Sequence, residues 1–339
     1  MNYWQIRCGS FGRDYAQEFL RYGMAFVFIG FNDVIDALEV GDRVIMKRGM
    51  TEVVAVGEVV QREGKHKGNA QEDGDSRHWL RDFDGWDLAS YCFVQWHVPK
   101  KPIRTEGLTR ATIQNVYTDH LRDLAERVLT TSPAQQTLEP EPSPTQPVSD
   151  DEILNFLIRQ GLRPGAAEDL TATLTRIRRL ARYYYDGAGG RWEDIREHET
   201  RTFLVIPLLL ALGWAEQQVK IELPIKGRQR ADLACFSSRY TGENEDCALI
   251  LESKGFSQGL EYAPDQAKTY AKHFPSCRTV VVSNGYCYKT YRRAGSQEFA
   301  EKPSAYLNLL SPRDRYPRDP GNVDGALEAL RSLLPVCCR

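Results

Sequence analysis

The feature that most constrains this 339-residue chain is a proline-rich stretch near its middle. Residues 131–150 read TSPAQQTLEPEPSPTQPVSD and carry five prolines with almost no apolar side chains. Such a stretch cannot bury a core and favours an extended, polyproline-like conformation. The chain also exceeds the roughly 100–200 residues of one typical domain. The sequence therefore predicts a folded part over residues 1–130 and another over 151–339, joined by this linker.

The charge is unevenly distributed over these parts. A formal net charge of −2 argues against a polybasic nucleic-acid binder. Residues 1–130 hold 17 Lys and Arg against 19 Asp and Glu, whereas residues 151–339 hold 27 against 24. Arginines crowd the start of the second part, at positions 176, 178, 179, 182, 191, 196 and 201. Contacts to a DNA backbone explain them, and so does surface solubility because acidic residues lie nearby.

Targeting and redox features predict a cytoplasmic protein without a membrane partner. No run reaches the roughly 18 apolar residues of a membrane span, and the N-terminus lacks the layout of a signal peptide. The eight cysteines form no C-x-x-C pair and no Cys/His cluster with zinc spacing. We therefore expect reduced core cysteines, with Cys337 and Cys338 exposed at the tail.

The first part is predicted to be rich in strands. Apolar and β-branched runs predict strands over residues 3–7, 25–29, 43–47, 51–61 and 91–98. Helical patterns cover residues 14–22 and 109–129, and a polar, glycine-containing loop covers 62–78. Short strands with long loops are typical of a small, partly open β-barrel.

The second part is predicted to be an α/β domain. Helices are expected over residues 153–160, 167–185, 197–212 and 264–274. Strands are expected over residues 218–223, 231–236, 248–253 and 279–283. The order is helices, then three strands, then a helix, then a strand.

Charged residues at two strand ends carry the candidate chemistry of the second part. Strand alternation puts Glu252 and Lys254 on one face, and pairing with the preceding strand brings Asp232 close to Glu252. Two close carboxylates repel each other unless a cation joins them, and Mg²⁺ needs few protein ligands. Lys254 can orient or deprotonate an attacking water and stabilise negative charge in phosphodiester hydrolysis.

The alternative for these residues is a strand that simply ends in solvated charge, because an acidic residue followed by E-x-K is common by chance. The run ALILESKG argues for function, since it places Glu252 and Lys254 within an apolar strand, where unpaired charge is costly.

Residues 196–291 resemble the N-terminal nuclease domain of type I restriction enzyme R subunits, within the PD-(D/E)XK superfamily. The resemblance runs in order through REHETRTFLVIPLLLALGW, RADLACF, LILESKG, APDQAKTYAKHF and VVVSNGYCYKTY, about a third of the chain. It implies a restriction-endonuclease-like α/β fold and Mg²⁺-dependent, or Mn²⁺-dependent, DNA cleavage. No G-x-x-x-x-G-K-[ST] phosphate loop is present, so no ATP-driven motor is expected.

The resemblance also assigns roles to individual residues. Asp232 and Glu252 match the metal-binding carboxylates, and Lys254 matches the lysine of the E-x-K pair. Glu199 matches the acidic residue on the helix before the sheet, with Glu197 as its competitor. Gln266 matches a glutamine on the following helix near the active site.

The first part resembles the EVE and related PUA-like domains, through MNYWQIRCG and LEVGDRVIMKRG…VVAVGEVV. These domains share a small β-barrel, and some bind modified bases in an aromatic pocket. Trp79 and Trp86 lie in loop-like sequence and offer stacking surfaces for a flipped base. Asp84, with Asp87, can accept hydrogen bonds from an exocyclic amine. Lys47 and Arg48 can contact phosphate.

Purely structural roles are the alternative for some of these residues. Tryptophans commonly cover the core of a small barrel, which is the expectation for Trp4 and Trp96. Lys47 and Arg48 are equally well explained as a solvated hairpin end.

Together these features predict a bacterial restriction or phage-defence endonuclease that cuts double-stranded DNA carrying a modified base. Double-strand cutting needs two nuclease domains, hence a homodimer at least transiently. One alternative is a nuclease effector triggered by a small nucleotide or RNA bound to the first domain. Another is a non-catalytic protein that binds modified nucleic acid.

Overall fold

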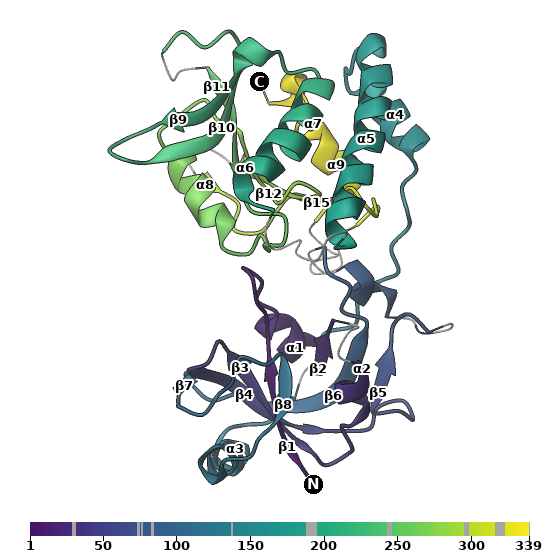
Figure 1. The fold of residues 1–339 in the computed structure, drawn as a ribbon, viewed down its shortest axis with the longest axis vertical. Helices are drawn as coiled ribbons and strands as arrows, with labels where there is room; N and C mark the ends of the chain where they lie inside the picture. Colours follow the sequence, from purple (N-terminus) through teal and green to yellow (C-terminus); the bar gives the residue numbers. More distant parts are fainter. Residues whose placement is uncertain are drawn as a thin grey trace. The chain divides into compact units, whose positions relative to one another are not determined.

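A computed structural model describes residues 1–28, 32–72, 75, 77–82, 85–136, 138–187, 195–242, 246–294, 298–315 and 323–338. The chain divides into two compact units, unit 1 (Met1–Pro144) and unit 2 (Thr145–Arg339). Both units are α/β, and each has a mixed sheet with its own hydrophobic core (Figure 1).

The sheet of unit 1 curls into a half-barrel, with eight strands over the described residues. Its strand order is β2-β6-β4-β3-β1-β8, with β5 added on β6 and β7 on β4. Strands β1 and β3 are parallel, and the other pairs are antiparallel. The elements are β1 Tyr3–Arg7, α1 Ala16–Tyr22, β2 Met24–Val27, α2 Asn32–Asp36, β3 Arg43–Arg48, β4 Glu52–Val59, β5 Lys67–Asn69, η2 His78–Asp82, β6 Ser90–His97, β7 Ile103–Arg104, β8 Ile113–Asn115 and α3 Asp119–Thr131.

Both faces of this sheet are buried. Along β3, Val44 and Met46 belong to one core and Ile45 to the other, because successive side chains of a strand point to opposite faces. The first core holds the aromatic side chains, including Trp4 and Trp96, which were expected to fill the core of a small barrel. The second core lies under α3.

The predicted helix over residues 109–129 is wrong in its first half. The helix begins only at Asp119, and Ile113–Asn115 instead forms β8, paired with β1. This pairing joins residues more than a hundred positions apart, so no local pattern announces it.

The proline-rich stretch is held by both units. On unit 1, the Gln135 N–H donates to the Trp96 carbonyl at 2.8 Å, and the Glu139 N–H donates to the Arg21 carbonyl at 2.9 Å. On unit 2, the Val148 N–H donates to the Pro312 carbonyl at 2.9 Å. The boundary between the units falls after Pro144, so residues 131–144 of the stretch belong to unit 1 and residues 145–150 belong to unit 2.

Unit 2 is built on a seven-stranded sheet over its described residues, in the order β14-β13-β12-β11-β10-β9 with β15 on β13. Strands β11 and β12 are parallel, and the other pairs are antiparallel. The elements are α4 Asp150–Arg159, α5 Pro164–Tyr185, α6 Glu197–Thr200, η4 Arg201–Val205, α7 Ile206–Ala211, η5 Glu216–Gln218, β9 Val219–Pro224, β10 Arg230–Phe236, β11 Cys247–Ser253, α8 Ala263–Ala271, β12 Thr279–Ser283, β13 Cys287–Ala294, β14 Glu298–Phe299, β15 Ala305–Asn308, α9 Ala326–Arg331 and η6 Pro335–Cys337.

Helices α6 and α8 bring side chains to the centre of this sheet. Helix α8 packs against β11 and β12, and α6 contacts β11 (Figure 1). Strand β11 is buried along its whole length, so charges at its end are held in a protein environment. This part of the fold positions the candidate site.

The cysteine prediction is corrected at the tail. All eight cysteines lie in the described part of the chain and are free thiols, and six of them are buried as expected. Cys338, predicted to be exposed, is also buried because it packs into the core of unit 2. No helix within the described ranges is long and apolar enough to cross a membrane.

Candidate active site

The sheet of unit 2 brings three carboxylates together on neighbouring strands. The register of β10 and β11 continues past the Leu233–Leu251 pair to Asp232 and Glu252. Glu222 lies on β9 level with Asp232, between the pairs Leu223–Ala231 and Ile221–Leu233. Directly opposite residues of antiparallel strands point to the same face. Asp232 and Glu252 therefore share one face, and Arg201 links Asp232 to Glu222 on β9.

Asp232 is fixed on both of its oxygens. Oδ2 accepts hydrogen bonds from the backbone N–H and the hydroxyl of Ser253, at 2.7 and 2.8 Å. Oδ1 lies 2.8 Å from Nη1 of Arg201, and Nη2 of that arginine donates to Glu222 Oε1 at 3.0 Å. The sequence analysis placed Arg201 among possible DNA-backbone contacts, but its side chain is turned inward and buried.

Glu252 is almost completely buried, with 2% of its side chain exposed. Oε1 accepts a hydrogen bond from Lys254 Nζ at 2.6 Å, whereas Oε2 is buried without a hydrogen-bond partner among the described residues. Burial raises the pKa of Glu252 to about 7, helped by the charges of Asp232 and Glu197 and opposed by Lys254. Burying a carboxylate oxygen without a hydrogen-bond partner costs free energy, so a ligand bound to Glu252 Oε2 would be favourable.

Lys254 follows β11 and is oriented by α8. Besides Glu252, its Nζ donates to Gln266 Oε1 at 3.3 Å, and Gln266 Nε2 donates to the Tyr270 hydroxyl at 2.9 Å. The structure thus brings together Asp232, Glu252, Lys254 and Gln266, all expected at one site.

The helix preceding the sheet contributes Glu197 rather than Glu199. Burial first, then the charge of Asp232 and a hydrogen bond with it, raises the pKa of Glu197. Glu199 instead accepts the backbone N–H of Arg196 at 2.9 Å, as the third residue of α6 capping its own helix. Residues two apart on a helix face different sides, so only one of these carboxylates can reach the sheet.

The residues at this site fit a divalent cation. Among the residues that the structure places, no group of three or more His, Cys, Asp or Glu side chains is arranged around a metal position. Mg²⁺ nevertheless requires only one or two carboxylates, because it keeps several waters. The unpartnered Glu252 Oε2, beside Asp232 and Glu197, offers the oxygen and the negative charge that such an ion takes.

The raised pKa of Glu252 predicts that cation affinity depends on pH. A cation binds the ionised carboxylate, so binding expels the proton that the carboxyl holds below about pH 7. We expect Mn²⁺ affinity, measured by titration calorimetry, to rise about tenfold between pH 6 and pH 8. The Glu252→Gln variant should lose both the affinity and its pH dependence.

The free energy of unfolding of the metal-free protein should fall as the pH rises, opposite to the trend in cation affinity. Because the folded-state pKa of Glu252 exceeds its ordinary value, its contribution to stability is present at low pH and is lost as the pH rises through about 7. Denaturant unfolding should therefore show a lower free energy of unfolding at pH 8 than at pH 5, relative to Glu252→Gln. A wild type and variant with identical pH profiles would contradict this assignment.

The base-binding residues expected in unit 1 are distributed differently. Trp79 is buried in the aromatic core, with its ring 4.8 Å from that of Tyr22. Lys47 is fully buried and donates to the carbonyls of Thr109 and Ala111, and burial lowers its pKa to about 8. Neither side chain is accessible to a base or a phosphate. Asp84 lies outside the described residues.

Trp86, like Asp87 and Arg48, lies nearer the surface of the described part of unit 1. Its half-buried ring is 6.3 Å from that of Phe11, which is 53% exposed. The Arg13 guanidinium lies 4.0 Å over the Trp86 ring. Asp87 accepts a hydrogen bond from Gln71 at 3.0 Å, and Arg48 is engaged with Asp14 and Glu52.

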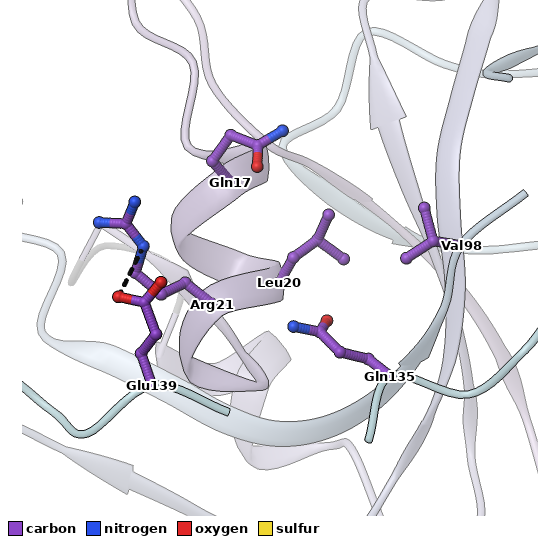
Figure 2. Close-up of a pocket in the computed structure, with 6 residues that line it drawn as sticks. All are labelled: Gln17, Leu20, Arg21, Val98, Gln135 and Glu139. Carbon is purple, nitrogen blue, oxygen red and sulfur yellow. Dashed lines mark ion pairs between the residues drawn. The ribbon is translucent and has the colours of Figure 1, made fainter. Parts of the chain in front are cut away.

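Unit 1 also has an open pocket beside α1. Its cavity measures about 310 Å³ and is shown in Figure 2. Arg21 Nε lies 3.2 Å from Glu139 Oε2 at its edge. The lining residues are Gln17, Leu20, Arg21, Val98, Gln135 and Glu139. The sequence analysis did not single out any of them.

No protein-family model matches this chain, and no curated protein matches it either.

Proposed function

We propose that this chain is a Mg²⁺-dependent endonuclease of a bacterial restriction or phage-defence system that cuts DNA carrying modified bases. Unit 2 would be a PD-(D/E)XK nuclease and unit 1 a PUA- or EVE-like reader. The observation that carries the proposal is the convergence of Asp232, Glu252 and Lys254 at the ends of the neighbouring strands β10 and β11, with Glu252 Oε2 buried and without a hydrogen-bond partner among the described residues.

Each residue has a role that its contacts support. Asp232 and Glu252 would hold the ion, with Glu197 adjoining them. Mg²⁺ or Mn²⁺, when bound, supplies Lewis acidity toward the phosphate. The Lys254 ammonium, held between Glu252 and Gln266, orients the attacking water and stabilises negative charge on the phosphate. Gln266 positions Lys254.

Trp86 and Phe11 support the reader role of unit 1. The Trp86 and Phe11 rings are neighbours, and Phe11 is exposed, which suits stacking on a base. The Arg13 guanidinium lies over the Trp86 ring but is itself buried, so no phosphate contact is assigned to it. This set replaces Trp79 and Lys47 as the proposed contact surface. Two copies of unit 2, in a transient homodimer, would cut both strands of a duplex.

The pocket beside α1 favours a second candidate, a nuclease triggered by a small nucleotide. At about 310 Å³ it reaches the lower end of ligand-site volumes, and its lining includes the Arg21–Glu139 ion pair, in which Arg21 could exchange Glu139 for a phosphate. In that case the ligand, rather than a modified base, would switch on cleavage.

A cleavage assay with three substrates tests these proposals. Wild type with Mg²⁺ should cut DNA that carries hydroxymethylated or methylated cytosine and leave unmodified DNA intact. Trp86→Ala should weaken binding to the modified DNA by about 10–100-fold, because one stacked base contributes about 1–3 kcal/mol. It should not change Mn²⁺ uptake.

Other outcomes separate the candidates. Cutting of unmodified DNA only after a cyclic dinucleotide or oligoadenylate is added would favour the triggered nuclease. Absence of cutting under every condition, with Mn²⁺ uptake equal in wild type and Asp232→Asn, would refute the nuclease assignment.

A further inference from the structure

Arg201 lies between two carboxylates at the candidate metal site. Its side chain is 7% exposed, and its two terminal nitrogens contact Asp232 and Glu222 on adjacent strands. Asp232 is held from its other side by Ser253. A planar guanidinium can bridge two carboxylates in this way, whereas a lysine ammonium offers only a point charge.

The backbone is irregular on both sides of this bridge. Glu222 has φ of 49°, a left-handed conformation that is rare for a residue with a side chain. The ladder between β9 and β10 lacks a pair at this position, although its neighbours on both sides are paired. Arg201 begins η4, a π-helical turn, and such turns are frequent at functional sites. Strained backbone of this kind persists where the surroundings hold it.

We propose that Arg201 is the positioning residue of the metal site, orienting Asp232 toward the ion, and that Glu222 holds Arg201 in place. The inference rests on the proposed function, because it presumes that Asp232 binds a cation. Arg201 acts through Asp232 and does not itself touch the metal or the substrate.

Two physical effects of Arg201 on cation binding have opposite signs. As a nearby positive charge it repels a divalent ion, so its loss would tighten binding. As the partner that orients Asp232 it improves binding, and loss of such outer partners typically weakens metal affinity by about 10–100-fold. Whether the loss of Arg201 weakens or tightens cation binding therefore tests the positioning role.

The test is Mn²⁺ titration calorimetry on the full chain without DNA. Arg201→Ala should weaken Mn²⁺ binding by about tenfold or more, and Arg201→Lys should fail to restore it, because one ammonium cannot bridge both carboxylates. Glu216→Ala, on an exposed side chain away from the site, gives the baseline. Unchanged or tighter binding by Arg201→Ala, or wild-type affinity in Arg201→Lys, would overturn the inference.

A matched pair at Glu222 decides the question if the arginine variants do not fold. The Glu222 side chain is 54% exposed, and both Glu222→Gln and Glu222→Ala keep a Cβ at the same φ. The glutamine amide oxygen still accepts from Arg201, so Glu222→Gln should bind Mn²⁺ more tightly than Glu222→Ala by about threefold or more. Equal affinities would refute the role of Glu222.

The inference and the proposed function fail in different ways. If Asp232→Asn binds Mn²⁺ as wild type does, the metal site itself is wrong. If Asp232→Asn abolishes binding while Arg201→Ala leaves it unchanged, only the positioning role fails.

Discussion

Lys254→Ala should lower DNA cleavage by about 10²–10⁴-fold while leaving DNA binding within a few-fold of wild type. Its Nζ lies 2.6 Å from Glu252 Oε1 and 3.3 Å from Gln266 Oε1, so the ammonium is held where water and phosphate would meet the carboxylates. Removing it takes away the charge that stabilises the phosphorane-like transition state and the group that orients the water.

Single-turnover cleavage of modified DNA at saturating Mg²⁺ measures this effect. Saturating metal is needed because Lys254 also lowers the pKa of Glu252, so its loss changes metal affinity as well. Lys272→Ala, at an exposed lysine just after α8, is the control and should cut at the wild-type rate. Cleavage by Lys254→Ala within threefold of wild type would exclude a catalytic role for this lysine.

Arg77→Met should destabilise unit 1 by about 2–3 kcal/mol, because it removes the hydrogen bonds of a buried guanidinium to Glu141 and Tyr91. The Arg77 side chain is 5% exposed, with Nη2 2.8 Å from Glu141 Oε1 and Nη1 donating to the Tyr91 hydroxyl at 3.2 Å. The guanidinium also lies 4.8 Å over the Phe93 ring. One side chain thus ties the proline-rich stretch, through Glu141, to the sheet.

Urea unfolding followed by tryptophan fluorescence measures this loss, because Trp79 lies beside Glu141. Arg81→Met is the matched control: Arg81 is 47% exposed and 4.0 Å from Asp87, so its loss should cost less than about 1 kcal/mol. Equal destabilisation by the two variants would show that burial of Arg77 contributes nothing beyond a surface ion pair.

The sequence predicted best where a local pattern decides the structure. Strands β10, β11 and β12 lie within one residue of the predicted ranges, because apolar runs bounded by polar residues are local signals. Alternation along the predicted strand put Glu252 and Lys254 on one face, and the assumed pairing with the preceding strand brought Asp232 close to Glu252. Nothing local distinguished Glu197 from Glu199, since helix capping and contact with the sheet compete for each carboxylate.

Burial and strand register were beyond the sequence. Lys47 and Trp79 are residue types that often make surface contacts, yet the fold of unit 1 buries both side chains. Glu222 carries no motif, and only the pairing of β9 with β10 brings it level with Asp232. The sequence did contain one indication that Arg201 belongs to the site. Arg201 follows Glu197 by four residues, about one helical turn, so both side chains lie on the same side of the helix. Its partners, however, lie on strands that come later in the chain.

The proline-rich stretch by itself indicated that this chain forms two units, because a segment with so few apolar side chains cannot build a core of its own. The sequence also determined which acidic and basic residues are available at the strand ends of unit 2. Only the tertiary structure decided which of them meet, and that Gln135, Glu139 and Glu141 bond to unit 1 while Gln146 and Val148 bond to unit 2. Such contacts depend on pairings between distant parts of the chain, and these become fixed only when the sheets form and their cores close.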